Sequence, residues 1–127
     1  MDRVPKILIV DDDVDLVKAM STVLKSKRYE VITGFNGEEG LQKARTEKPD
    51  LVLLDIMMPV MDGYDVAYHF KKDPVLSKIP VLALTSFSES SGQPFEFEVS
   101  EYIRKPIAPK DLLEMVGKHL KKMGFPQ

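Results

Sequence analysis

Five short apolar runs recur along the chain, separated by stretches with helical spacing, and this alternation limits the possible folds more than any other feature. The first, third and fourth runs are almost continuous in Ile, Leu and Val, as expected of strands buried on both faces of a parallel sheet. The runs are KILIV (6–10), EVITG (30–34), DLVLLDI (50–56), PVLALTS (80–86) and EYIRKPI (101–107).

Amphipathic patterns fill most of the intervals between these runs. Apolar side chains follow helical spacing after the first run (16–23), the second (37–48), the third (61–72) and the fifth (112–120). Strands that alternate with helices favour a parallel sheet with right-handed crossovers. The sequence therefore predicts an α/β fold with a doubly wound, five-stranded parallel sheet, in one domain that spans residues 1–127.

Composition excludes several classes of function. The chain has 127 residues, 43% of them hydrophobic, and a formal net charge of -2, so it carries no basic footprint for direct nucleic-acid binding or for an anionic membrane surface. It has no cysteine, which excludes disulfides and thiolate metal sites. No stretch resembles a signal peptide or a membrane span. We expect a soluble, cytoplasmic protein.

Four aspartates crowd residues 11–15, directly after the first apolar run. Carboxylates this close repel one another, most strongly where the local dielectric is low. A calcium-binding EF-hand loop that begins at Asp11 would need Gly and Glu where Leu16 and Thr22 stand. A phosphatase of the haloacid dehalogenase type would need Thr or Val where Asp15 stands. The EF-hand is therefore rejected, and the phosphatase motif is not matched.

For Asp13 and Asp15, a solvated helix N-terminus is a sufficient explanation, because aspartate caps helices and complements their dipole. Asp11 and Asp12 lie closer to the strand. Since ligands bind outside the carboxyl ends of strands in open parallel sheets, these two residues are candidates for a site.

Other polar residues end the later runs in the same way. Asp55 ends the third run, Thr85 the fourth, and Lys105 and Pro106 fall in the fifth. Each has an ordinary structural explanation by itself: a strand threonine, a surface lysine or a helix cap. Together they mark one edge of the predicted sheet as a site.

With these residues in place, the sequence resembles the receiver domain of bacterial two-component response regulators, the CheY-like family. The resemblance covers residues 5–121, and its most specific part is DIMMPVMDG (55–63). It implies the strand order 2-1-3-4-5. It also implies a phosphorelay function, in which Asp55 accepts a phosphoryl group from a histidine kinase, a histidine phosphotransfer protein or a small phosphodonor.

The resemblance further implies a metal site for Mg²⁺. Asp12 would bind the ion directly, Asp11 largely through water, and Asp55 and the backbone carbonyl of Met57 would supply further oxygens. Oxygen ligands suit Mg²⁺, so His69 and His119 are not needed, and we expect both on the surface. The three carboxylates contribute -3, whereas Mg²⁺ and Lys105 contribute +3. This balance explains how the acidic crowding is tolerated.

The remaining roles also follow from the resemblance. Thr85 would hydrogen-bond the phosphoryl oxygens, and Lys105 would pair with Asp55 and then with the phosphate. A cis Lys105–Pro106 bond would aim the lysine, although X–Pro bonds are usually trans. Tyr102 is either a switch residue coupled to Thr85 or an aromatic side chain that half-covers the sheet edge.

Residues 87–99 depart from the family pattern. Receivers carry a helix between strands four and five, but here Gly92 and Pro94 interrupt the segment and Phe95 to Val99 alternate with period two. We expect this helix to be degenerate or missing, with Phe95, Phe97 and Val99 covering the core or forming a small apolar patch.

We expect a phosphoacceptor that assists its own phosphorylation and not a turnover enzyme, with an output partner that the sequence does not identify. The alternatives are a phosphorylation-independent binding module on the same scaffold and a Mg²⁺-dependent phosphatase.

Overall fold

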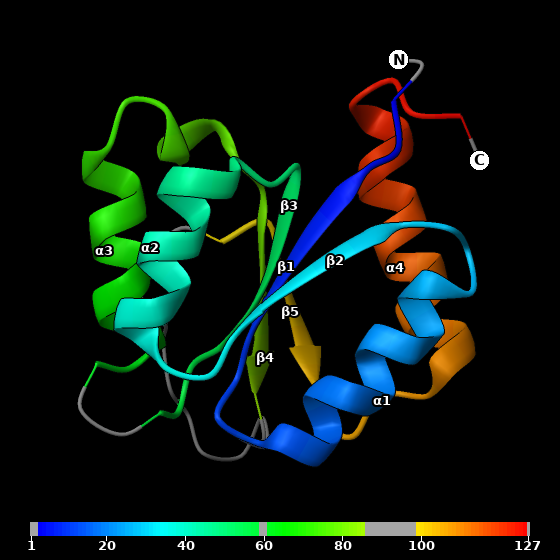
Figure 1. The fold of residues 1–127 in the computed structure, drawn as a ribbon, viewed down its shortest axis with the longest axis horizontal. Coiled ribbons are helices and arrows are strands. Elements are labelled where there is room, and N and C mark those ends of the chain that lie inside the picture. The colour runs from blue at the N-terminus through cyan, green and yellow to red at the C-terminus, as the bar shows by residue number, and fades with distance from the viewer. Residues whose placement is uncertain (1–2, 59–60, 86–98, 127) are drawn as a thin grey trace.

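The computed structural model describes residues 3–58, 61–85 and 99–126. Strands and helices alternate along this part of the chain (Figure 1). The elements are β1 (Lys6–Val10), α1 (Val14–Lys25), β2 (Glu30–Gly34), α2 (Gly37–Glu47), β3 (Leu51–Asp55), α3 (Gly63–Lys72), the 3-10 helix η1 (Leu76–Lys78), β4 (Val81–Thr85), β5 (Glu101–Arg104) and α4 (Pro109–Lys122).

All five strands form one sheet in the order β2-β1-β3-β4-β5, and every neighbouring pair is parallel. This confirms the predicted fold class and strand order. Because the strands are parallel, all of their carboxyl ends lie at the same edge, at the bottom of Figure 1. This edge is called the carboxyl edge below, and the opposite one the amino edge.

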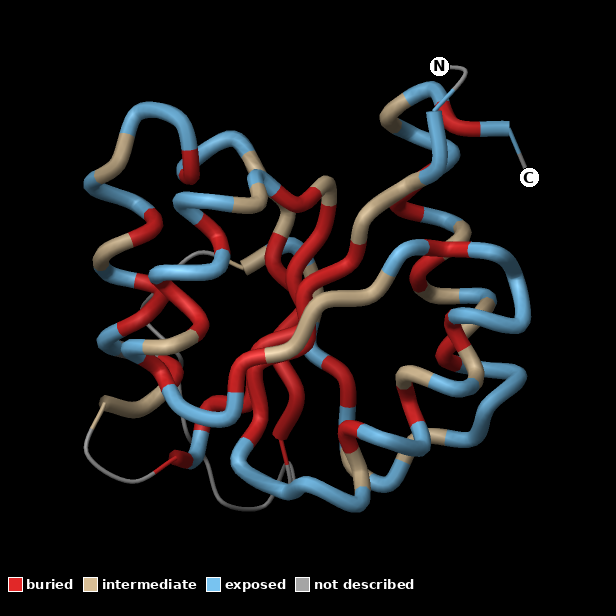
Figure 2. Tube along the Cα trace, viewed as in Figure 1, coloured by how far each residue is buried: buried red, intermediate tan, exposed pale blue. Residues whose placement is uncertain are grey.

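Helices cover both faces of the sheet, and each face has its own core. On one side, α1 and α4 pack against inward-facing strand residues such as Ile9, Leu53 and Leu84, whereas α2 and α3 cover the other side at Leu54 and neighbouring residues. Every residue of β3 and β4 is buried, which accounts for the continuous apolar runs of these two strands (Figure 2).

Short polar side chains begin three of the helices. Asp13, Asn36 and Asp62 occupy the N-caps of α1, α2 and α3, and each side chain accepts a hydrogen bond from a backbone N–H in the first turn. Helix α4 begins instead with Pro109, which needs no donor at that position. These starts fix the points at which the chain leaves the carboxyl edge.

At the amino edge, Asp50 precedes β3 and joins it to the start of the chain. Its carboxylate accepts two hydrogen bonds from the Arg3 guanidinium, that from Nη1 at 2.7 Å, and a third from the backbone N–H of Lys6 at 2.8 Å. Burial is the largest influence on Asp50 and opposes ionisation, but these bonds outweigh it and lower its pKa.

The expected loss of the helix between β4 and β5 concerns residues 86–98, which lie outside the described part of the chain. Val99, the last residue of the unusual segment, is described and packs against the core on the α2 and α3 side. Within the described residues, no helix is both long enough and apolar enough to span a membrane.

Candidate functional site

The carboxyl edge collects polar residues from four strands. Asp11 follows β1 directly, Asp55 ends β3, Thr85 ends β4 and Lys105 follows β5. Asp11 is completely buried, and Asp55 and Thr85 are 3% and 7% exposed. Residues as far apart in the chain as Asp11 and Lys105 therefore meet at one place, as the position of each at a strand end predicts.

Three carboxylates form the acidic part of the site. One oxygen from each of Asp11, Asp12 and Asp55 lies within 4.8 Å of the others, and only Asp12 is exposed. Local hydrogen bonds orient the two buried groups. Asp11 Oδ1 accepts the N–H of Asp13 at 3.0 Å, and Asp55 Oδ1 accepts the N–H of Met57 at 3.1 Å.

Lys105 is the cation of the site. Its Nζ lies 2.8 Å from Asp11 Oδ2 and 3.3 Å from Asp55 Oδ2, so one ammonium bridges both buried carboxylates. Burial alone would lower the pKa of Lys105, but its interactions with Asp11 and then with Asp55 raise it. The sequence prediction paired Lys105 with Asp55; the structure adds Asp11 as the nearer partner. The Lys105–Pro106 bond is cis, the conformation that the family resemblance implies.

The surroundings of Asp55 favour its protonated form. Burial, followed by the charge of Asp11, raises the pKa of Asp55 to about 6, although Lys105 and the N–H of Met57 act in the opposite direction. One lysine therefore does not neutralise this group of carboxylates.

A divalent cation fits this surplus of negative charge. Among the described residues, three carboxylates face a single ammonium, which leaves a formal charge of -2 when all are ionised. Asp11 Oδ2 is buried, and its described partner is the Lys105 ammonium. The donors are all oxygens, the ligand type that Mg²⁺ prefers. The residues present are therefore suited to Mg²⁺.

The structure also places the other predicted site residues. Met57 lies in the loop after β3, and its side chain is exposed. The carbonyl of Thr85 accepts the N–H of Lys105 at 2.7 Å, which ties the end of β4 to the lysine. Tyr102 pairs in register with Ala83 on the outer strand β5 and is 39% exposed, so it lies at the sheet edge.

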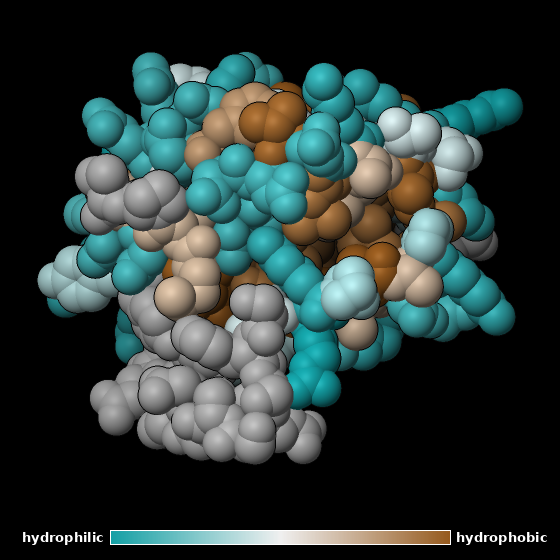
Figure 3. Space-filling model, turned by 90° about the horizontal axis from the view of Figure 1, so that it is seen from below, coloured by the Kyte–Doolittle hydropathy of each residue, from teal (hydrophilic) through white to brown (hydrophobic). Residues whose placement is uncertain are grey.

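Apolar side chains share the carboxyl edge with these polar groups. Figure 3 views the molecule from this edge and shows apolar patches among hydrophilic residues. Val14 at the start of α1, Phe35 after β2 and Met57 after β3 are among the exposed large apolar residues.

Two glycines brace the loop that follows Asp55; the sequence assigns Gly63 to loop geometry, but it gives no such role to Gly37. The N–H of Gly63 donates to the carbonyl of Ile56 at 2.9 Å, and a Cβ at Gly63 would lie 2.5 Å from Ile56 Cα and 2.6 Å from the Asp55 carbonyl oxygen. A Cβ at Gly37 would lie 2.5 Å from the Met61 carbonyl oxygen. Both positions exclude a side chain because backbone approaches them closely.

The expectation that His119 lies on the surface was wrong. His119 is 8% exposed, and its Nε2 lies 2.8 Å from Glu101 Oε1, which also pairs with Lys118. The apolar stripe of α4 could have indicated this burial, since His119 follows Val116 by three residues. This cluster lies apart from the carboxylates and supplies no group to the site.

Together, the parallel sheet and its acidic edge define a receiver domain. The family model described as "Response regulator receiver domain" matches residues 7–117, and the chain belongs to this family. This finding confirms the resemblance on which the sequence predictions rested.

Curated relatives include longer transcriptional regulators. The probable transcriptional regulator ycf27 of Pyropia yezoensis is 41% identical over 109 residues, covering 84% of this chain and 44% of the relative. The alkaline phosphatase synthesis transcriptional regulatory protein PhoP of Bacillus subtilis is 38% identical over 109 residues, covering 84% of this chain and 45% of the relative. The chain thus spans less than half the length of these relatives.

Solved receiver structures share the fold along nearly the whole chain. A CheY-like receiver domain protein of Methanospirillum hungatei has a TM-score of 0.84 at 30% identity, covering 94% of this chain and 96% of that one. The receiver domain of a Pseudomonas aeruginosa sensor histidine kinase, solved with magnesium in its active-site cleft, has a TM-score of 0.82 at 22% identity, covering 91% and 97%. The latter shows likeness of fold alone.

Proposed function

We propose that Asp55 accepts a phosphoryl group from a histidine kinase, a histidine phosphotransfer protein or a small phosphodonor, and that the phosphorylated domain then binds an output partner differently. One observation supports this best: two buried carboxylates from different strands share a single lysine and retain surplus negative charge. A purely structural ion pair needs no second buried carboxylate.

Asp55 is the proposed nucleophile because it ends a buried strand and the N–H of Met57 fixes its Oδ1. An Asp55 oxygen forms a bond to phosphorus while the bond between phosphorus and the donor breaks. The leaving group, an imidazole nitrogen for a phosphohistidine or an oxygen for a small phosphodonor, keeps the electron pair of that bond. The product is an acyl phosphate on Asp55. Hydrolysis of this group later restores the carboxylate, so the domain is a phosphoacceptor and not a turnover enzyme.

Asp11, Asp12, Asp55 and the Met57 carbonyl would hold Mg²⁺. When bound, this ion would neutralise charge on the carboxylates and on the transferred group, which is the main requirement of phosphoryl transfer.

Lys105 and Thr85 are proposed to respond to the phosphoryl group. Lys105 starts between the two buried carboxylates and can follow the negative charge as it builds on the new group. Thr85 ends the neighbouring strand and can donate its hydroxyl to a phosphoryl oxygen. The added group carries roughly -1.5 to -2 charge and several acceptor oxygens, enough to draw both residues inward. Tyr102 on β5 is the proposed reporter of this change.

The proposal places the domain in the cytoplasm, with which its lack of cysteine is compatible. It assigns the domain no direct contact with nucleic acid, because the net charge is -2 and the transcriptional relatives are more than twice as long as the matched region.

Acetyl phosphate and Mg²⁺, followed by intact mass measurement, test the proposal. Wild-type protein should gain one phosphoryl mass, and Asp55→Asn should gain none. Asp13→Asn is the matched control, since Asp13 lies in the same acidic stretch but caps α1 through the N–H of Leu16. It should keep a normal adduct.

Other outcomes would contradict the proposal. A normal adduct on Asp55→Asn, mapped to Asp11 or Asp12, would show that Asp55 is not the phosphoacceptor. Absence of any adduct on folded wild-type protein would favour a phosphorylation-independent binding module. Repeated hydrolysis of the phosphodonor without a trapped adduct would favour a phosphatase.

A further inference from the structure

An open groove lies between the end of α1 and helix α4, two helices that contact each other on one face of the sheet (Figure 1). It has a volume of about 300 Å³. We call it the α1–α4 groove, and its lining residues are Lys27, Leu113, Glu114, Gly117, Lys118 and Lys121. None of these residues belongs to the carboxylate site, so the groove is a separate feature of the surface.

Leu113 and Gly117 form the apolar part of the groove. Together with Lys121 they are spaced four residues apart in α4, so the three lie in a row along one side of the helix. Leu113 and Gly117 are half-buried. Glycine is unfavourable inside a helix relative to alanine, and it leaves the helix backbone without a side chain to cover it. The row therefore offers an apolar surface with room for one aliphatic side chain.

The charges around this apolar surface are mainly positive. Three lysines and one glutamate give the lining a formal charge of +2, whereas the whole chain carries -2. Lys118 pairs with Glu101 at 3.0 Å, but Lys27 and Lys121 form no ion pair with any residue that the structure describes. Lysines near helix C-termini also complement the helix dipole. That role does not require lysines from two distant segments to line one apolar groove.

We propose that the α1–α4 groove is a docking surface for an acidic segment of a partner protein. An aliphatic side chain of the segment lies on Leu113 and Gly117, and its carboxylates pair with Lys27 and Lys121. Charge complementarity favours this occupant, because the local positive charge attracts an anionic segment and repels a cationic one. The small volume of the groove limits the segment to a single apolar anchor between its charged residues. The proposal does not depend on phosphorylation of Asp55.

An acidic peptide with one aliphatic residue tests the proposal on the unphosphorylated protein. The probe is acetyl-Glu-Glu-Leu-Glu-Glu-amide, and NMR follows the Gly117 amide and the Leu113 methyl groups during its titration. Both sets of resonances should shift and reach saturation. Raising the salt from about 50 mM to about 500 mM should weaken binding, because exposed charges are then screened. Absence of these shifts at millimolar peptide would overturn the proposal.

A second peptide, with serine in place of the leucine, separates docking from general charge attraction. It has the same charge but no apolar anchor, so it should bind at least about fivefold more weakly. Equal affinities for the two peptides would mean that the lysines attract anions without a docking groove, and would overturn the proposal. If the same resonances shift on dilution of the protein without peptide, the groove would be assigned to a second copy of this chain instead.

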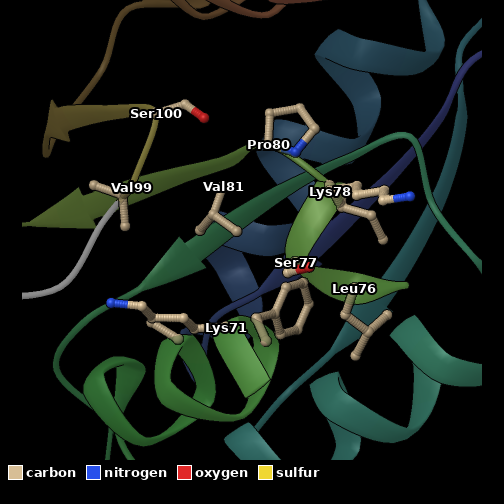
Figure 4. A pocket seen from close by; sticks show the side chains of 11 residues that line it. Lys71, Leu76, Ser77, Lys78, Pro80, Val81, Val99 and Ser100 are labelled. Carbon is tan, nitrogen blue, oxygen red and sulfur yellow. The ribbon is translucent and has the colours of Figure 1, made fainter. Parts of the chain in front are cut away.

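Matched lysine variants test the positions of the charges. Lys27→Ala and Lys121→Ala should each weaken binding of the leucine peptide about threefold, since each removes one exposed ion pair. Lys71→Ala is the control, because Lys71 is an exposed lysine that lines a different pocket, of about 390 Å³, at the end of α3 on the other face of the sheet (Figure 4). It should leave the affinity unchanged.

The melting temperature shows whether the variants remain folded. All three lysines are exposed, so each variant should melt close to the wild type. Equal weakening by Lys71→Ala, or no weakening by Lys27→Ala and Lys121→Ala, would overturn the proposal.

Discussion

The two ends of β3 carry the same residue type in opposite electrostatic states. Asp50, just before the strand, receives hydrogen bonds from Arg3 and Lys6, and its pKa is lowered. Asp55, at the other end, is more buried and faces a second carboxylate, and its pKa is raised to about 6. Burial acts in the same direction on both, so the difference lies in the partners. The protein itself satisfies Asp50, whereas Asp55 lies in a site suited to an additional cation.

The largest expected effect comes from displacing the backbone of the loop that follows Asp55 at the end of β3. Gly63→Ala would place a Cβ within 2.6 Å of backbone atoms of Asp55 and Ile56, which cannot move aside as a flexible side chain can. We expect a loss of about 3 kcal/mol in the free energy of unfolding, at the upper end of overpacking effects, and a reduced rate of phosphoryl-adduct formation. Urea denaturation and intact mass would measure the two effects. An unchanged adduct rate would show that the loop tolerates displacement.

Magnesium should stabilise the protein through the carboxyl edge and not through the amino edge. At a concentration one hundred times its Kd, Mg²⁺ should add about 2.7 kcal/mol to the free energy of unfolding, because it binds only the folded site. Asp12→Asn should weaken this gain, whereas Asp50→Asn should retain it. Melting temperatures in Mg²⁺ and in EDTA provide the measurement, and identical values for the wild type would count against a metal site.

In EDTA, the Asp55 contribution to the free energy of unfolding should decrease as pH rises. Its pKa is raised from an unfolded value of about 3.9, so the folded state binds more protons between about pH 4 and pH 6. The contribution of Asp55 is therefore most favourable below pH 4 and is lost as pH rises through 6, by about 2 kcal/mol in order of magnitude. Asp55→Asn should remove this slope. A difference between wild type and variant that is constant from pH 4 to pH 7 would disprove the shift.

Asp50 should show the opposite sign. Its pKa is lowered, so its stabilising charge is fully present above about pH 3.9 and is lost as pH falls through the folded-state pKa. Asp50→Asn should cost about 1.5 kcal/mol at pH 7, the loss typical of hydrogen bonds to a charged group. The cost should shrink in acid. Urea denaturation of both proteins at pH 7 and pH 3 would measure it, and a cost that grows in acid would reverse the assignment.

The smallest effect is expected from Arg3→Ala. The Arg3 side chain is 58% exposed, and exposed ion pairs contribute less than about 1 kcal/mol. The variant should nevertheless raise the pKa of Asp50, because the hydrogen bonds and the charge of Arg3 both lower it and are lost, whereas the N–H of Lys6 remains. NMR titration of the Asp50 carboxyl carbon would detect this. No change in that pKa would mean that Lys6 alone sets it.

The sequence predicted most of the fold because strands buried on both faces consist of continuous runs of apolar residues. The run KILIV coincides with β1, and the other strands lie within the predicted runs. The strand ends then identified Asp11, Asp55, Thr85 and Lys105 as neighbours, since parallel strands share one carboxyl edge. Strand order itself came from family resemblance, because apolar runs do not specify which strands pair.

Details that depend on three-dimensional distances were not predicted. Nothing in the pattern shows that Lys105 Nζ lies nearer to Asp11 than to Asp55, or that backbone meets Gly37 and Gly63. The burial of His119 was missed because a histidine on an apolar stripe needs a polar partner, and Glu101 is 18 residues away in the chain. Such partners can be identified only when the positions of the strands and helices in the fold are known.

The ion pair between Lys105 and Asp11 also has a consequence for how the chain folds. The two residues are 94 positions apart in sequence, so their contact requires closure of almost the whole chain. Contacts of this length are slow to form, because the entropy of closing the loop is lost before any interaction offsets it. A nascent or partly unfolded chain therefore has Asp55 without Lys105 beside it. Under the proposed function, competence to accept a phosphoryl group would arise only with the complete native topology, and incompletely folded molecules would not be phosphorylated.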